Sequence, residues 1–363
     1  METRAAAAKR RASAAKIVQI ENPQLKKQRV VLGELLDLPN LVAPSVMNQP
    51  KEKENLQHWR NPVKRLALTK RILPFPDLIL DDPQIDDPYV SDIYKYLRSM
   101  EVQKRRRPMV DYTEKVQREV TANMRGILVD WLVEVADEYK LLPDTLHRSV
   151  SFVDRFLSVN PVSKSRLQLL GVSSMLIAAK YEEINPPGVD EFCSITDNTY
   201  KKTDVVKMEA DVLKSLNFEM GNPTVNTFLS WFADVASENQ KKPNTQIEFL
   251  GCYLSELGLL DYDCLRFLPS VLAASAIFLA RFIVSPEVHP WSPSLAEILG
   301  YKSIELKECV LILHDLYLSR KAASLQAVRE KYKQHKFKYV ANLPSPSYIP
   351  NHYFEDQWCS ATL

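Results

Sequence analysis

The heptapeptide SMLIAAK, residues 174–180, decides the fold of this chain, because a close counterpart, SAIFLAR, stands 101 positions later at residues 275–281. Each heptapeptide is apolar, includes small residues and ends in one cation. A helix so uniformly apolar must be surrounded on all sides, and its Ser and Ala positions let neighbouring helices approach closely. We therefore predict that each heptapeptide lies in the central helix of a bundle, and that the chain contains an internal duplication.

Helical patterns of apolar residues surround both heptapeptides in the same order. The first set falls at about residues 119–140, 143–158, 164–183, 189–196 and 201–216, and the second at about 223–236, 244–259, 265–284, 293–299 and 303–320. A further amphipathic pattern precedes them, with Tyr89, Ile93 and Leu97 at spacings of four residues. The sequence thus predicts an all-α protein of two tandem five-helix bundles with a helix in front.

Charge is distributed unevenly along the chain. Residues 1–75 hold 15 Lys and Arg against 6 Asp and Glu, a balance of +9, so the net charge of +2 leaves −7 for residues 76–363. Residues 1–80 are rich in Ala, Lys, Arg and Pro without a sustained helical face, which predicts a disordered basic leader. Its clusters Lys9-Arg10-Arg11 and Lys26-Lys27 fit a nuclear import signal or simply solvated tail charge. The acidic remainder argues against a core that binds nucleic acid through its phosphates.

The sequence shows no constellation typical of an enzyme or a metal site. The six histidines form no i, i+4 pair and no HExxH motif, and no glycine-rich phosphate loop occurs. The five cysteines include no CxxC pair, which excludes a zinc ribbon and fits a reducing compartment. The longest apolar run, residues 267–284, contains Pro269 and Arg281 and predicts a buried helix instead of a membrane span. We expect no catalytic residues, no cofactor, no metal and no membrane or nucleic-acid partner.

The segment MRGILVDWLVEVAD, residues 124–137, is apolar over more of its helical circumference than one core could cover. One broad arc of apolar residues would face the bundle interior. Met124, Ile127 and Trp131 fall on a different arc, and Glu134 continues it. This second stripe predicts a second partner, which is either the neighbouring bundle or another protein.

Two pairs of charged residues stand out from the apolar patterns. Arg125 points to the core side of its helix and Asp154 lies within an apolar stretch, so we predict that they meet in a buried ion pair. Lys180 ends a central helix, and Glu209 lies in the amphipathic segment 205–216. These two could form an ordinary surface ion pair, or they could project together to hold another protein's backbone.

Five motifs then resemble the cyclin box in order and spacing. They are MRGILVDWLVEV at 124–135, SFVDRFLS at 151–158, SRLQLLGVSSMLIAAKYEEINPP at 165–187, DEFCSITDNTY at 190–200 and KMEADVLKSLNF at 207–218. The resemblance covers about residues 87–335, with a weaker second box, and points to the mitotic A/B group, most like plant A-type cyclins. On this basis we divide the chain into a leader (1–80), an N-terminal helix and linker (81–118), a first cyclin box (119–219), a second (220–321) and a C-terminal helix and tail (322–363).

The resemblance implies a non-catalytic subunit that binds and activates a cyclin-dependent kinase, from S phase to mitosis. Lys180 and Glu209 match the pair that grips the kinase around its PSTAIRE-type helix, which favours the second interpretation given above. Further residues match kinase contacts of the family: Tyr181, Glu182, Glu183, Ile184, Phe218, Tyr89 and Ile93. Arg125, Asp154 and Leu169 match residues of the box itself.

The resemblance also implies a docking patch for Arg-x-Leu segments of substrates and inhibitors. The matching residues are Met124, Ile127, Leu128, Trp131, Glu134, Leu167 and Gln168. Trp131 and Met124 would form an apolar floor, and Glu134 would face the arginine. Gly126 replaces the alanine usual in the family, which weakens the helix by up to about 1 kcal/mol without touching the docking chemistry.

In the leader, Arg29-Val30-Val31-Leu32 resembles the destruction box through which a ubiquitin ligase captures mitotic cyclins. Residues 65–68 and 166–169 fit the same RxxL pattern. Of the three, the motif at Arg29 and Leu32 has the favourable context, because a disordered stretch beside lysines is open to capture and to ubiquitin attachment. The expected location is the nucleus and also the cytoplasm.

Two other functions remain compatible with a duplicated helical fold. A transcription factor of cyclin fold predicts a basic core and often a cysteine-rich zinc module, whereas this chain has an acidic core and no CxxC pair. A helical scaffold predicts no stimulation of a kinase at all.

Overall fold

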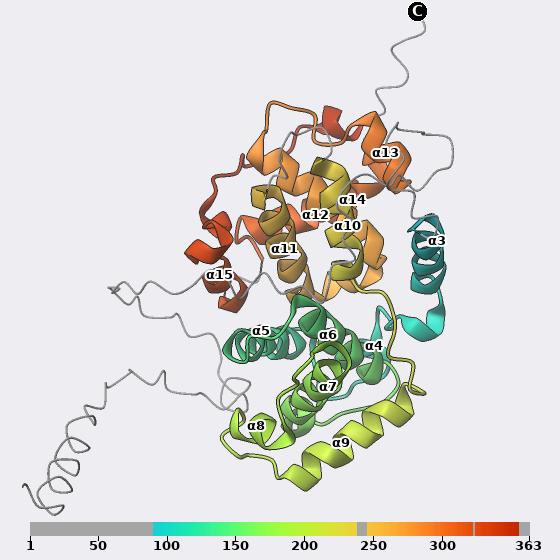
Figure 1. The fold of residues 1–363 in the computed structure, drawn as a ribbon, viewed down its shortest axis with the longest axis vertical. Helices are drawn as coiled ribbons and strands as arrows, with labels where there is room; N and C mark the ends of the chain where they lie inside the picture. The colour runs from blue at the N-terminus through green and yellow to red at the C-terminus, as the bar shows by residue number, and fades with distance from the viewer. Residues whose placement is uncertain (1–89, 238–244, 322–323, 356–363) are drawn as a thin grey trace, which may run out of the picture. The chain divides into compact units, whose positions relative to one another are not determined.

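The structure is a computed structural model that describes residues 90–237, 245–321 and 324–355. Every regular element within these ranges is helical, which confirms the all-α prediction. Figure 1 shows a first group of helices, α5 to α9, and a second group, α10 to α14. The predicted disordered leader, which contains Arg29 and Leu32, lies outside the described residues, and so does Tyr89 of the predicted N-terminal helix.

The first bundle is built around α7, as the heptapeptide predicts. Its helices are α5 (Ala122–Glu138), α6 (Pro143–Leu157), α7 (Leu167–Glu182), α8 (Val189–Ser194) and α9 (Lys202–Ser215). All side chains of α7 from Leu167 to Ala179 are buried, and the other four helices pack around it. Small residues allow this packing: a Cβ on Gly171 would come within 2.8 Å of Leu128 Cδ1 on α5. Thr121 begins α5 by accepting a hydrogen bond from the backbone N–H of Met124, and Pro143 stands at the first turn of α6.

The second bundle repeats this plan around α12. Its helices are α10 (Val225–Ser237), α11 (Thr245–Leu260), α12 (Pro269–Val284), α13 (Pro293–Leu299) and α14 (Ser303–Tyr317). α12 is mostly apolar and packs against α10, α11 and α14. However, Lys180 of α7 and the equivalent Arg281 of α12 differ in the contacts that they make. Arg281 at the end of α12 donates hydrogen bonds inward, to the carbonyls of Ala236 (2.8 Å) and Pro290 (2.9 Å).

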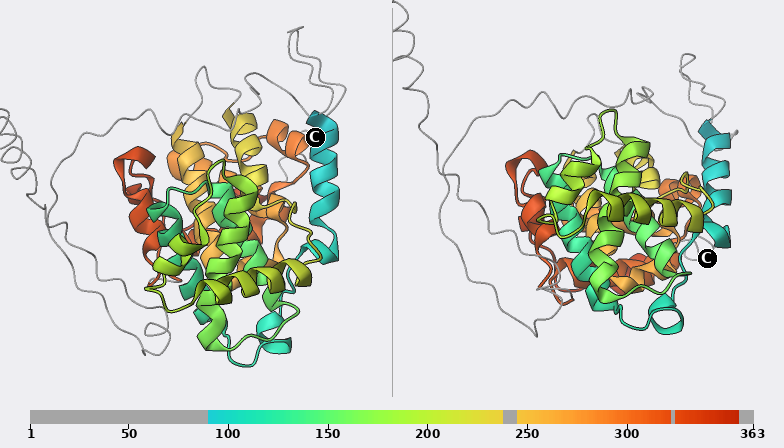
Figure 2. Two further views of the ribbon diagram at one scale, coloured as in Figure 1. Left: turned by 60° about the horizontal axis from the view of Figure 1, so that its bottom comes forward. Right: turned by 90° about the horizontal axis from the view of Figure 1, so that it is seen from below.

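The preceding helix, α3 (Val90–Glu101), packs against the second bundle. Tyr94 donates a hydrogen bond to the carbonyl of Leu299 (3.1 Å) and packs on Trp231, with ring centroids 4.5 Å apart. Glu101 accepts hydrogen bonds from the backbone and hydroxyl of Ser270. Both views in Figure 2 agree that α3 lies on one side of the second bundle and the C-terminal α15 (Ala327–Tyr332) on the other.

Candidate functional site

Lys180 and Glu209 lie side by side at the edge of the first bundle. The Lys180 Nζ atom, at the end of α7, is 2.6 Å from Glu209 Oε1 on α9. The lysine side chain is 48% exposed and the glutamate side chain 13%. The ammonium therefore still has donor capacity toward solvent, while the carboxylate is held mostly against its own bundle.

The four residues that follow Lys180 include two exposed apolar side chains and, between them, two carboxylates that point inward. Tyr181 and Ile184 are exposed, Ile184 by 79%. Glu183 turns inward and accepts hydrogen bonds from Leu142 N (2.7 Å) and Thr145 Oγ1 (2.6 Å), which fixes the first turn of α6. The Glu182 carboxylate pairs with Arg148 on α6. The apolar members of this corner, defined here as residues 180–184, thus face solvent, and its two carboxylates hold it to α6.

Phe218 and Ile93 are also exposed apolar residues. Phe218 follows α9, is 67% exposed and has a left-handed backbone with φ of 57°. A Cβ on the nearby Gly221 would lie 3.1 Å from the Tyr181 hydroxyl, so the chain after Phe218 returns beside the corner. Ile93 on α3 is 54% exposed.

The predicted pair Arg125 and Asp154 forms deep between the bundles. Arg125 Nη2 lies 2.8 Å from Asp154 Oδ2 and Nε lies 3.0 Å from Oδ1, with both residues at most 2% exposed. Tyr112 donates a third hydrogen bond to the carboxylate (2.8 Å), and Arg125 also donates to the carbonyl of Leu259 on α11. Burial by itself lowers the pKa of Arg125, but the adjacent Asp154 carboxylate outweighs burial, so this pKa is raised. Because Arg125 also donates to Leu259 of α11, the pair joins the two bundles.

The residues predicted for substrate docking divide between surface and interior. Met124, Ile127 and Trp131 are half-buried along one face of α5, and Glu134 on the same stripe is exposed. Leu128 and Leu167 have no exposed surface, and Gln168 is 4% exposed. In this structure the last three residues are therefore buried and offer almost no surface for docking.

One further residue of α5 contacts the C-terminal helix. Asp130 accepts a hydrogen bond from the backbone N–H of Ala327 at the start of α15 (3.0 Å). Burial, opposed by the hydrogen bond from Ala327 N and assisted by the nearby Glu134, raises the pKa of Asp130 to about 7. Lys336 also reaches α5 from beyond α15, and its Nζ lies 3.0 Å from Asp137 Oδ1.

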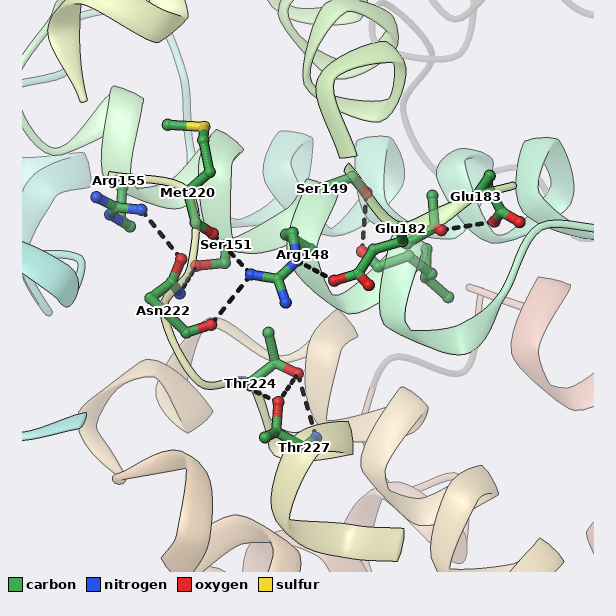
Figure 3. A network of polar contacts seen from close by, with 12 residues as sticks. Arg148, Ser149, Ser151, Arg155, Glu182, Glu183, Met220, Asn222, Thr224 and Thr227 are labelled. Atoms are coloured by element: carbon green, nitrogen blue, oxygen red, sulfur yellow. Dashed lines mark hydrogen bonds and ion pairs between the residues drawn. The ribbon is translucent and has the colours of Figure 1, made fainter. Parts of the chain in front are cut away.

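The chain between the bundles is fastened by α6, and the sequence interpretation did not identify this network. Figure 3 shows Arg148, Ser151 and Arg155 reaching the linker, residues 219–224. Arg148 Nη1 donates to the carbonyls of Met220 (2.6 Å) and Asn222 (3.2 Å). Arg155 Nη1 donates to the carbonyl of Glu219 (2.9 Å) and to Asn222 Oδ1 (3.1 Å). Two arginines seven residues apart fall on the same face of a helix, and both lie here among buried positions of α6; this is the pattern that could have indicated the network.

Groups of potential metal ligands and membrane-spanning helices are both absent from the described residues. Among them, no three or more His, Cys, Asp or Glu side chains are grouped as metal ligands would be. The helices in the described ranges are too short, or not apolar enough, to span a bilayer.

Comparisons with known proteins match the whole described region. A family model described as Cyclin, N-terminal domain, matches residues 92–221, and one described as Cyclin, C-terminal domain, matches residues 223–346. Cyclin-A3-2 of Arabidopsis thaliana is 53% identical over 359 residues, which covers 97% of this chain and 96% of that protein. The G2/mitotic-specific cyclin C13-1 of Daucus carota is 59% identical over 331 residues, which covers 91% of this chain and 96% of that protein.

A solved structure shares the fold. The viral cyclin from herpesvirus saimiri superposes with a TM-score of 0.55 and 18% sequence identity, over 62% of this chain and 96% of that one. The likeness extends to the architecture alone, because the identity is low.

Proposed function

This chain belongs to the cyclin family, and from that membership we propose that it is a regulatory subunit that binds and activates a cyclin-dependent kinase in the cell cycle. Its relatives are plant A-type cyclins, and cyclins have no catalytic activity of their own. The surfaces that the chain presents would then determine which kinase it binds and which substrates the complex phosphorylates.

The Lys180–Glu209 pair is the observation that supports this proposal most strongly. It lies at the edge of a bundle whose central helix is completely packed, with exposed Tyr181 and Ile184 beside it. An ammonium can donate to carbonyls of a partner's backbone, and a carboxylate can accept from its amides. The surrounding apolar side chains would supply contact area that is buried on binding.

Activation follows if the kinase has two arrangements and only one fits this surface. A ligand shifts such an equilibrium by its difference in affinity for the two states. The α7 core leaves this edge little freedom to adapt, since packed interiors resist deformation. We therefore expect the kinase to change conformation while the cyclin bundle stays as it is.

A double substitution tests the proposed grip. Lys180→Ala with Glu209→Ala should abolish co-purification of the kinase while leaving helical circular dichroism unchanged. The matched control is Arg266→Ala with Glu308→Ala, which removes a 2.8 Å surface ion pair of the second bundle. Kinase binding that survives the first double substitution, or that is lost equally in the control, would overturn the assignment.

We further propose that the stripe of Met124, Ile127 and Trp131 docks Arg-x-Leu segments, with Glu134 facing the arginine. These side chains are half-buried on α5 and keep exposed surface, whereas Leu128, Leu167 and Gln168 would act only as their support. The leader motif at Arg29 and Leu32 would serve a ubiquitin ligase, and the protein would act in the nucleus and also the cytoplasm.

A further inference from the structure

Arg148 is a nearly buried arginine that contacts both the corner at 180–184 and the linker at 219–224. It lies in the second turn of α6, and 10% of its side chain is exposed. Its Nε donates to the Glu182 carboxylate, and its guanidinium carbon lies 4.6 Å from the centre of the Tyr181 ring. Its Nη1 donates to the carbonyls of Met220 and Asn222 in the linker. Figure 3 shows the guanidinium between Glu182 on one side and the linker on the other.

The chemistry of the site requires an arginine. Met220 and Asn222 are at most 9% exposed, and a buried carbonyl without a donor is costly. A guanidinium has five N–H donors in a fixed plane, so it can serve a carboxylate and two carbonyls together while stacking on a ring. A lysine ammonium has one nitrogen and cannot occupy both positions.

Arg155 provides an internal comparison, because it holds the same linker from the same face of α6. Its donors reach Glu219 and Asn222, and Ser151 between the two arginines accepts from Asn222 Nδ2 (2.8 Å). Among the described residues, Arg155 makes no hydrogen bond, ion pair or ring contact with the corner at 180–184, whereas Arg148 contacts two residues of that corner. The linker is therefore fastened at several points, and Arg148 alone among them also holds the corner.

The close approach of the linker to the corner has a second, independent indication. Gly221 lies between the two residues whose carbonyls Arg148 binds, and a Cβ there would come within 3.1 Å of the Tyr181 hydroxyl. Tyr181 is thus confined between the Arg148 guanidinium and the linker backbone, although 53% of it stays exposed.

We propose that Arg148 is a positioning residue for the kinase: it fixes the corner at 180–184 relative to the linker, so that both bundles present their surfaces in one arrangement. This inference rests on the proposed function. It predicts that losing Arg148 loosens the corner and the linker together. Kinase affinity should fall by about tenfold, the loss expected when a charged hydrogen-bonding partner is removed. The docking stripe on α5 should keep its affinity.

The test compares Arg148→Met with Arg155→Met in the full-length chain. Three quantities are measured for each: the Kd for purified cyclin-dependent kinase, the Kd for an Arg-x-Leu peptide, and the midpoint of thermal unfolding. We expect Arg148→Met to weaken kinase binding about tenfold with peptide binding unchanged, and Arg155→Met to lower the midpoint with less than a threefold change in kinase affinity. Equal kinase affinities of the two variants, or equal losses for kinase and peptide, would refute the positioning role.

A second variant covers the case in which Arg148→Met does not fold. Arg148→Lys keeps the charge and the helix propensity, and should weaken kinase binding to a smaller extent because one ammonium cannot reach both groups. A normal kinase affinity in Arg148→Lys would also refute the proposal. If the unmodified chain binds no kinase, the proposed function itself fails, which distinguishes the two outcomes.

Discussion

Arg125 and Asp154 form a two-point ion pair in which neither residue exposes more than 2% of its surface, at the place where the two bundles meet. The carboxylate also accepts from Tyr112, and the guanidinium also donates to Leu259, so both ions have several partners. A buried charge with this many hydrogen bonds is tolerated, but either ion alone would be strongly unfavourable.

The first prediction follows from that burial. Arg125→Met leaves the Asp154 carboxylate uncompensated, and should lower the free energy of unfolding by about 3–5 kcal/mol. Urea unfolding monitored by circular dichroism measures it. In the control, Lys202→Ala removes an exposed pair with Asp190 and should cost less than about 1 kcal/mol. Similar losses for the two variants would contradict the assigned role of burial.

The second prediction concerns pH. Burial raises the pKa of Asp130 to about 7, while in the unfolded chain the group titrates near its ordinary value of about 4. The folded state therefore holds a proton that the unfolded state has lost, and the contribution of Asp130 to stability falls as the pH rises from about 4 to about 7. Asp130→Asn keeps an acceptor for Ala327 N and should remove this part of the pH dependence, which unfolding curves at pH 5 and pH 7.5 would detect. An unchanged slope would show that Asp130 titrates normally.

The third prediction separates docking from kinase binding. Met124→Ala with Trp131→Ala removes the exposed apolar surface of the α5 stripe. Phosphorylation of Arg-x-Leu substrates should fall, while binding of the kinase persists, because the stripe lies on a different helix from Lys180 and Glu209. Short peptide substrates without an Arg-x-Leu segment are the control. If they suffered to the same extent, the stripe would have no docking role.

The fourth prediction concerns Gly126. Replacing an interior helical glycine by alanine usually gains up to about 1 kcal/mol in helix propensity. Here the new Cβ would lie 3.3 Å from the Leu260 carbonyl oxygen and 3.2 Å from Leu325 Cδ1. Backbone of the second bundle cannot move away as a side chain can, so Gly126→Ala should not raise the free energy of unfolding. A gain of about 1 kcal/mol in urea unfolding would show that the junction has room to adjust.

Much of the fold could be predicted from the sequence, because helical periodicity is a local property. The predicted ranges 143–158 and 293–299 correspond closely to α6 and α13, and both heptapeptides lie in central helices. The pairing of Arg125 with Asp154 could be inferred because only another ion can make a charge acceptable in an apolar pattern.

The site was less accessible to such reasoning. Glu182 and Glu183 are neighbours of exposed residues, and nothing in their own pattern indicates that their carboxylates bond to α6. How deeply the side chains of Leu128 and Leu167 are buried depends on how α5 packs against α7. Arg148 and Arg155 were missed because their acceptors are mostly backbone carbonyls, which every residue possesses and no sequence pattern distinguishes.

The different use of the two equivalent cations has a consequence for stoichiometry. Lys180 closes the central helix of one half and points outward, whereas Arg281 closes that of the other half and is bonded to Ala236 and Pro290 of its own bundle. The second bundle thus repeats the helical architecture of the first, but its equivalent cation does not project outward as Lys180 does. Each chain should engage a single kinase molecule, so sedimentation of the mixed proteins should reveal complexes of one copy each, however large the excess of kinase.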